Sequence, residues 1–537
     1  MEQFSKAAAH IIDDVLAHDP IAATFAGVHT YDHDMPDLSA DGFAQRQARA
    51  RAYLDTLHGY DSAPLDVDDR LDRDLMLATI EVKLRELVEV QDFRRNPSLY
   101  CDAAVNGVYA ILLRDYAPFD ERLPALRSRL EQIPAVLRSG TQNLDRPPRI
   151  WIETALDECA GAKSFFTDAV GPLVDDRPDA RRALHGALEA LGAFETELQA
   201  RLGRADGAAF ALGRDLFDYK LAREHMLPYD ADSLLEFGES AVRSTQAALE
   251  SVAARIDASK SWPQLVEALR EDHPSEESLL DEYRRSLAAA RQFVVQQALV
   301  SIPQGERLNL VETPAFLRPT LPYAAYQPAG AFDAKQDGTY YVTPVQADAP
   351  AATRRDQLLG HNRYGMLLTN VHEGYPGHHL QLVRSNRVSS VPRRIFGDSS
   401  VFCEGWALYC EQMVLDAGID PDPRVRLFQL KDQLWRACRV VVDVRLHTSG
   451  LSFEDAVDFM VDVAHLERFN AIGEVRRYTQ TPTQPMSYLV GKQQIMDLRE
   501  RERSRLGSSF DLRSFHDRLL SVGTVPIALV ESRLAAT

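Results

Sequence analysis

Apolar residues recur at intervals of three and four along most of this chain, and this spacing restricts the fold more than any other feature of the sequence. The pattern is clear in 71–90, 123–144 and 231–256, and it resumes after Ala351. Because an α-helix turns once every 3.6 residues, this spacing places the apolar side chains on one helical face. We therefore predict a mainly α-helical protein.

The helical pattern is interrupted in one stretch, where prolines recur and β-branched and aromatic residues gather. Within it, 308–313 and 338–344 are the strand candidates. We expect three successive parts: a helical N-terminal half (1–300), a β-containing connector (301–350) and a helical catalytic half (351–537). These parts could also form one continuous fold.

The charge balance restricts the partners of this chain. There are 60 Lys and Arg against 79 Asp and Glu, a formal net charge of −19, and such an acidic surface repels phosphate backbones and anionic lipid headgroups. No stretch reaches the roughly 18 uncharged apolar residues that span a bilayer. Asp13 and Asp14 interrupt the first amphipathic stretch, so no signal peptide is visible. We expect a cytoplasmic protein that binds neither nucleic acid nor membranes; its oligomeric state is left open.

The segment 371–381 (VHEGYPGHHLQ) places three histidines and a glutamate close together. In the zinc motif H-E-x-x-H, two histidines four residues apart bind the metal and the glutamate acts on metal-bound water. Here a proline occupies the second ligand position. A regular helix would turn His378 away from His372 and displace His379 by about 10 Å along the axis. We expect a two-residue bulge at the Pro-Gly pair that brings His378 to the ligand position, with His379 as the alternative.

A second segment supplies a candidate third ligand. Glu404 and Glu411 are seven residues apart, on one face of a predicted helix for which Ser400 is the candidate N-cap. A carboxylate from a second helix completes the two-histidine, one-glutamate set of many catalytic zinc sites, which leaves one position open for water. Glu404 can therefore complete a site with the histidines.

These motifs resemble those of a known family, the bacterial domain-of-unknown-function proteins marked by H-E-x-x-P-G-H-H-x-Q and E-G-W-A-x-Y, which look like divergent gluzincin metallopeptidases. The resemblance covers most of the chain. It implies a largely helical fold in which the zinc helix lies next to a small sheet. It also implies one Zn²⁺ per chain, with His372, His378 and Glu404 as ligands and Glu373 as general base. The residues in register are His372-Glu373, Pro376-Gly377-His378-His379, Gln381 and Glu404-Gly405-Trp406-Ala407.

The expected function is a zinc-dependent hydrolase, with a peptidase as the leading hypothesis. Zinc lowers the pKa of bound water to roughly 7, and Glu373 would transfer the proton to the leaving nitrogen. Tyr488, Tyr478 and Arg477 are the candidates for stabilising the oxyanion. If Arg477 instead captures a terminal carboxylate, the enzyme would be a carboxypeptidase.

Two other functions fit the same residues. One is a zinc hydrolase of a small non-peptide amide or ester, and the other is a catalytically silent helical binding protein. Glu373 argues against the silent protein, because a glutamate that is not a ligand has little reason to lie there unless it acts on water. The strand at 340–343 could pair with an extended peptide if it lies at a sheet edge, or it could be an ordinary buried strand.

Overall fold

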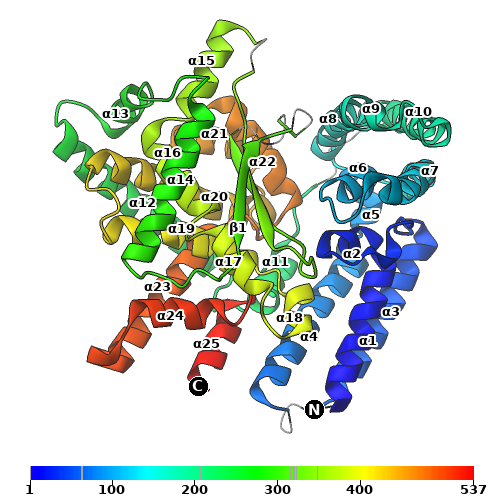
Figure 1. Ribbon diagram of the computed structural model, residues 1–537, viewed down its shortest axis with the longest axis horizontal. Helices are drawn as coiled ribbons and strands as arrows, with labels where there is room; N and C mark the ends of the chain where they lie inside the picture. Colours follow the sequence, from blue (N-terminus) through cyan, green and yellow to red (C-terminus); the bar gives the residue numbers. More distant parts are fainter. Residues whose placement is uncertain are drawn as a thin grey trace. The chain divides into compact units, whose positions relative to one another are not determined.

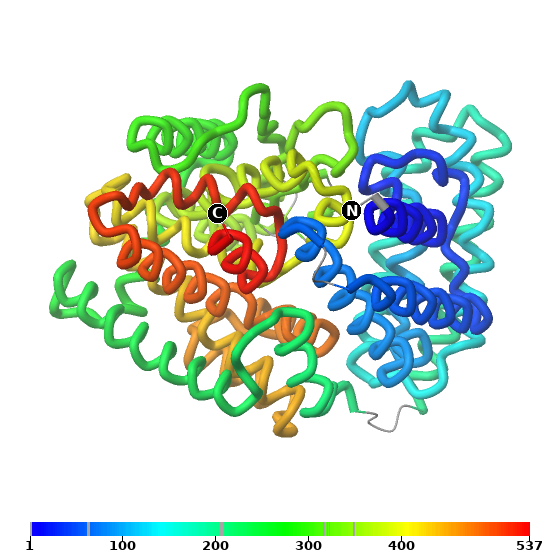
Figure 2. Tube along the Cα trace, turned by 90° about the horizontal axis from the view of Figure 1, so that it is seen from below, coloured from blue at the N-terminus to red at the C-terminus, as the bar shows by residue number. Residues whose placement is uncertain are grey.

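The computed structural model is mainly helical, as predicted (Figure 1). The residues that it describes are 2–61, 65–204, 209–314, 317–318, 321, 323–346 and 349–536. The chain divides into two compact units, Met1–Phe210 with Gly330–Ala334, and Ala211–Ala329 with Lys335–Thr537. In Figure 2 the helices of the first unit are blue to cyan, and those of the second are green to red.

The first unit consists of helices. They are α1 Glu2–His18, α2 Pro20–Ala26, the 3-10 turn η1 His29–Tyr31, α3 Ala40–His58, α4 Val67–Arg85, the π-helical η2 Glu86–Val90, α5 Asp92–Arg95, α6 Ser98–Leu112, α7 Phe119–Asn143, α8 Arg149–Ser164, the π-helical η3 Phe165–Val170, α9 Gly171–Val174 and α10 Pro178–Leu202.

The second unit holds the sheet and the remaining helices. They are α11 Arg214–Arg223, α12 Ala231–Ile256, α13 Trp262–Leu269, α14 Leu279–Gln296, β1 Arg307–Glu312, β2 Ala324–Gln327, β3 Asp337–Val342, α15 Ala351–Gly360, α16 Arg363–Glu373, α17 His378–Ser385, α18 Val391–Phe396, α19 Ser400–Asp416, α20 Pro423–Thr448, α21 Phe453–Asp462, α22 Arg468–Gln480, α23 Ser487–Leu506, the 3-10 turn η5 Gly507–Ser509, α24 Leu512–Leu520 and α25 Ile527–Ala535.

The spacing of apolar residues located the helices well. The predicted segment 71–90 is α4 followed by η2, 123–144 lies almost wholly within α7, and 231–256 coincides with α12. Helix α7 shows the physical reason, because its buried leucine and isoleucine side chains recur every three or four residues and face α6 and α10. These buried residues include Leu126, Leu130, Ile133 and Leu137.

The sheet has the strand order β1-β3-β2, with β1 parallel and β2 antiparallel to β3. Both predicted strands exist, as β1 and β3. Strand β3 lies in the middle of the sheet with Tyr340 and Val342 fully buried, so the proposal that 340–343 is an edge strand is wrong and the buried alternative is confirmed. These side chains pack against Tyr283 of α14 and Met366 of α16. The small sheet therefore lies next to the predicted zinc helix.

Helices α19 and α23 cross at two glycines, Gly405 and Gly491. A Cβ atom on Gly491 would overlap the carbonyl oxygen of Val401 and lie 2.8 Å from the Cα atom of Gly405. The two backbones are thus in direct contact, which only glycine permits. This contact sets the separation between α19, which carries Glu404, and α23, which carries Tyr488.

Substituting alanine at this crossing is expected to destabilise the protein. Gly491→Ala forces the two helices apart, and overpacking of this kind costs about 1–3 kcal/mol. Urea denaturation should show the lower free energy of unfolding. Gly473→Ala is the matched control, since Gly473 is exposed on α22 and a Cβ there meets nothing within 4 Å; the control should be neutral or more stable. Equal stability of the two variants would contradict the tight crossing.

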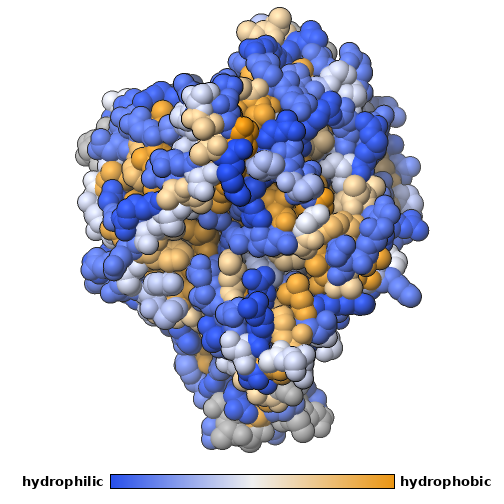
Figure 3. Space-filling view, turned by 90° about the vertical axis from the view of Figure 1, so that its left-hand side faces the viewer, coloured by the Kyte–Doolittle hydropathy of each residue, from blue (hydrophilic) through white to orange (hydrophobic). Residues whose placement is uncertain are grey.

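The surface matches the charged composition. The face in Figure 3 is mostly hydrophilic, and its apolar side chains lie in separate patches. Among the helices of the described residues, none is both long and apolar enough to cross a membrane. All five cysteines are free.

Candidate metal centre

The helix that carries His372 is interrupted after Glu373. Helix α16 ends there, and α17 begins at His378. The amide of Gly377 donates a hydrogen bond of 3.0 Å to the carbonyl of Val371, six residues back instead of four. Two extra residues are therefore accommodated, as expected, and His378 takes the place of the second histidine in H-E-x-x-H. A Cβ atom at position 377 would overlap the carbonyl oxygen of His372, so this turn requires glycine.

The interrupting segment is held from two sides. The indole of Trp406, fully buried on α19, donates a hydrogen bond of 2.8 Å to the carbonyl of Pro376, which follows a cis peptide bond. On the other side, the hydroxyl of Tyr375 donates to Glu306 at 2.6 Å. The tryptophan of the E-G-W-A segment thus fixes the turn that positions His378.

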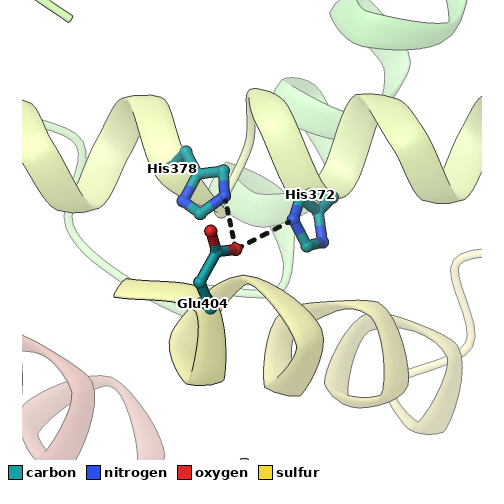
Figure 4. A group of neighbouring side chains, drawn as sticks. All are labelled: His372, His378 and Glu404. Atoms are coloured by element: carbon teal, nitrogen blue, oxygen red, sulfur yellow. Dashed lines mark ion pairs between the residues drawn. The ribbon is translucent and has the colours of Figure 1, made fainter. Parts of the chain in front are cut away.

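Three side chains converge beside this turn (Figure 4). His372 extends from α16, His378 from α17 and Glu404 from α19, and their ligand atoms all lie within 4.8 Å of one another. Oε2 of Glu404 lies 3.3 Å from Nε2 of His378 and 3.7 Å from Nε2 of His372. The N-cap of α19 is Ser399, which accepts from the amide of Phe402, and not the expected Ser400. The structure brings together the three residues that the sequence analysis selected.

The chemistry of this cluster suits a divalent cation. Oε2 of Glu404 is buried and makes no hydrogen bond to the described residues, although buried carboxylate oxygens normally have partners. Burial lowers the pKa of both histidines, but contacts with Glu404 and then Glu411 raise the pKa of His372, and Cys403 and then Glu404 raise the pKa of His378 well above its usual range. Burial raises the pKa of Glu404, but the two imidazoles bring it well below its usual range. Two imidazoles and one carboxylate are typical ligands of Zn²⁺.

Glu411 orients His372. Nδ1 of His372 donates to Oε1 of Glu411 at 2.8 Å, so the opposite ring nitrogen faces Glu404. A carboxylate that binds the second nitrogen of a ligating histidine is the usual outer partner of a metal site. No role was predicted for Glu411, although its spacing of seven from Glu404 places both residues on one face of α19.

His379, the alternative ligand, faces away from the cluster. It is fully buried, its Nε2 donates to Glu306 at 2.6 Å, and its Nδ1 lies 3.2 Å from the hydroxyl of Tyr326. The structure therefore gives it a place between the sheet and α17. Of the two histidines left open by the sequence, His378 is the one that joins His372.

Glu373 lies beside the cluster without joining it. Its carboxylate accepts a hydrogen bond of 3.1 Å from the backbone amide of Tyr326 on β2. Its charge also contributes to the raised pKa of His372. This edge of the sheet therefore holds the candidate general base next to a candidate ligand.

The three candidates for oxyanion stabilisation have different neighbours in the structure. The ring of Tyr488 stacks beside His372 with 6.4 Å between centroids and 19° between planes. Burial, and then the charge of Glu404, raise the pKa of Tyr488. The hydroxyl of Tyr478 instead donates to Glu474 at 2.6 Å, and Arg477 donates to Glu474 at 3.0 Å and to Gln484 at 2.7 Å. Tyr488 is thus the candidate that lies against the histidine.

The fold and the site define a mainly helical protein with a largely buried cluster of two histidines and one glutamate. The chain belongs to the family described as "Bacterial protein of unknown function (DUF885)", whose model matches residues 20–534. Among curated proteins, none matches the chain.

Two solved structures are similar over nearly the whole chain. One is described as a "putative lipoprotein of unknown function" from Shewanella oneidensis, with 25% identity, a TM-score of 0.84 and 99% of each chain covered. The other, described as a "putative lipoprotein", is from Colwellia psychrerythraea, with 18% identity, a TM-score of 0.82 and coverage of 99% of this chain and 98% of that one. The second likeness concerns the fold alone.

Proposed function

We propose that this protein is a zinc-dependent hydrolase that cleaves peptide bonds, in a site of the gluzincin kind. The observation that carries the proposal is the buried convergence of His372, His378 and Glu404, in which an oxygen of Glu404 lacks a hydrogen-bond partner among the described residues. Two further carboxylates support the proposal. Glu373 lies beside the candidate ligands, and Glu411 orients His372. A purely structural metal site does not need both.

In this proposal each side chain has one role. His372, His378 and Glu404 would hold Zn²⁺, which would supply a Lewis acid and an activated water when bound. Glu373 takes a proton from the attacking water and delivers it to the leaving nitrogen. Tyr488, whose phenol carries its proton at neutral pH, donates a hydrogen bond to the developing oxyanion.

Metal removal tests this function directly. The purified protein should contain about one zinc per chain and hydrolyse members of a mixed peptide library, as mass spectrometry of the products would show. Dialysis against a chelator should abolish hydrolysis, because the Lewis acid and the activated water are lost together, and about one equivalent of zinc should restore it. Undiminished hydrolysis by the metal-free protein would refute the zinc mechanism. A zinc-loaded protein that cleaves no peptide would refute the peptidase.

A further inference from the structure

We infer that the substrate of this site carries a free carboxylate, bound by an arginine cluster next to the candidate metal centre. The arginine cluster consists of Trp435, Arg436 and Arg439 on α20 together with Tyr488 on α23. This inference rests on the proposed function, since it names the substrate class of the same site. The chemistry that fits is the terminal carboxylate of a peptide.

The two arginines of the cluster share two aromatic rings. Cζ of Arg439 lies 4.2 Å from the ring centroid of Trp435 and 4.6 Å from that of Tyr488. Cζ of Arg436 lies 4.3 Å and 5.7 Å from the same two rings. Because Tyr488 also stacks beside His372, the guanidinium groups lie one aromatic side chain away from the candidate metal centre.

Several donors of the arginine cluster are not used. Arg439 is only 3% exposed; its Nε donates to Tyr478 at 2.8 Å and its Nη2 to Glu474 at 2.9 Å. Its Nη1 is buried and has no acceptor among the described residues, and the same holds for Nε of Arg436 and Nε1 of Trp435. Buried N–H groups without acceptors are costly and uncommon. A carboxylate oxygen can accept from such a donor, and a guanidinium group is suited to bind it.

The local charge favours an anion. Among the described residues on this side of the site, four cationic side chains are joined by ion pairs or hydrogen bonds to two carboxylates. Glu474 accepts from both Arg439 and Arg477, whereas Asp432 lies 3.1 Å from Lys431 and 3.8 Å from Arg436. This group keeps a positive excess within a chain of net charge −19. A negatively charged substrate end would therefore be drawn to this place.

The arrangement also replaces an earlier candidate. The sequence favoured Arg477 for carboxylate capture, but its guanidinium group already donates to Glu474 and Gln484. Arg439 retains a buried donor without an acceptor among the described residues, and its Cζ lies 4.6 Å from the ring centroid of Tyr488. Because Tyr488 separates the cluster from His372, a carboxylate bound there would place the scissile bond near the C-terminus of the peptide, as in a carboxypeptidase.

The test compares one cleaved peptide in two forms, as the free acid and as the C-terminal amide. The wild type should cleave the free acid at least tenfold better in kcat/KM. In Arg436→Gln and Arg439→Gln, KM for the free acid should rise at least tenfold relative to KM for the amide, so that the preference for the free acid disappears. Arg445→Gln is the control: Arg445 lies on the same helix, pairs with Glu239 and is not in the cluster.

The outcomes separate the two proposals. Equal cleavage of the acid and the amide by the wild type would overturn the inference without contradicting the proposed hydrolase function. An unchanged preference for the acid in folded Arg436→Gln and Arg439→Gln would have the same meaning. Absence of cleavage of both forms by the zinc-loaded protein would refute the proposed function and the inference with it. Arg436 is partly exposed, so Arg436→Gln supplies the decisive result if Arg439→Gln fails to fold.

Discussion

Glu373→Gln is expected to retain its zinc and its fold and to lose hydrolysis by about 10²- to 10⁴-fold, the usual effect of removing a general base. The amide is nearly isosteric, and its oxygen can still accept the hydrogen bond from the backbone of Tyr326. What it cannot do is take a proton from water. Measuring kcat/KM alongside zinc content and thermal unfolding would separate chemistry from stability.

A surface glutamate provides the control for this substitution. Glu500 lies exposed on α23, so Glu500→Gln should leave both zinc and turnover unchanged. If the Glu373→Gln protein kept near-normal turnover with full zinc, proton transfer would have to be assigned to another group.

Glu404→Ala is expected to lose most of its zinc. It removes the anionic member of the three-residue cluster and leaves two imidazoles whose nearest carboxylate, Glu411, is bound to the other nitrogen of His372. Zinc analysis after passage over a chelating column should fall from about one ion per chain to near none. His372→Ala should behave in the same way.

A milder substitution at Glu411 tests whether zinc affinity also depends on the residue that orients His372. Glu411→Gln keeps all three ligands and weakens only the support of His372, so we expect zinc affinity to fall by about 10- to 100-fold without vanishing. Competition with a zinc-binding dye would measure the difference. Full zinc occupancy in both Glu404→Ala and His372→Ala would show that the ion binds elsewhere.

The predictions that succeeded were those that local sequence determines. The helices follow from apolar spacing, because a face that recurs every 3.6 residues is buried whatever the neighbouring helix is. The position of His378 followed from the local sequence, because a single turn at Pro376 and Gly377 accommodates the two residues that this motif has in addition to H-E-x-x-H. Glu404 followed from a predicted helix with a carboxylate at a fixed place on it, although the N-cap of that helix is Ser399 and not the predicted Ser400.

The features that were missed depend on how distant segments meet. A central and an edge strand both favour β-branched and aromatic residues, so 338–344 alone could not show that β1 and β2 flank it. Arg477 and Tyr478 are adjacent to polar neighbours on α22, whereas Arg439 belongs to a largely apolar stretch of α20. The role that we propose for it depends on the contacts of α20 with Tyr488 and Glu474, which no local spacing indicates.

The crossing of α19 and α23 also bears on when the site can form during synthesis of the chain. His372 and His378 are close in sequence and can approach each other early, whereas Tyr488 reaches its place beside His372 only when α23 packs on α19 at Gly405 and Gly491. Contacts between distant segments carry a larger loop-closure cost than local ones. A nascent chain that ends before α23 lacks Tyr488 and the helix that α19 contacts most extensively, so the complete site can form only after α23 has been synthesised.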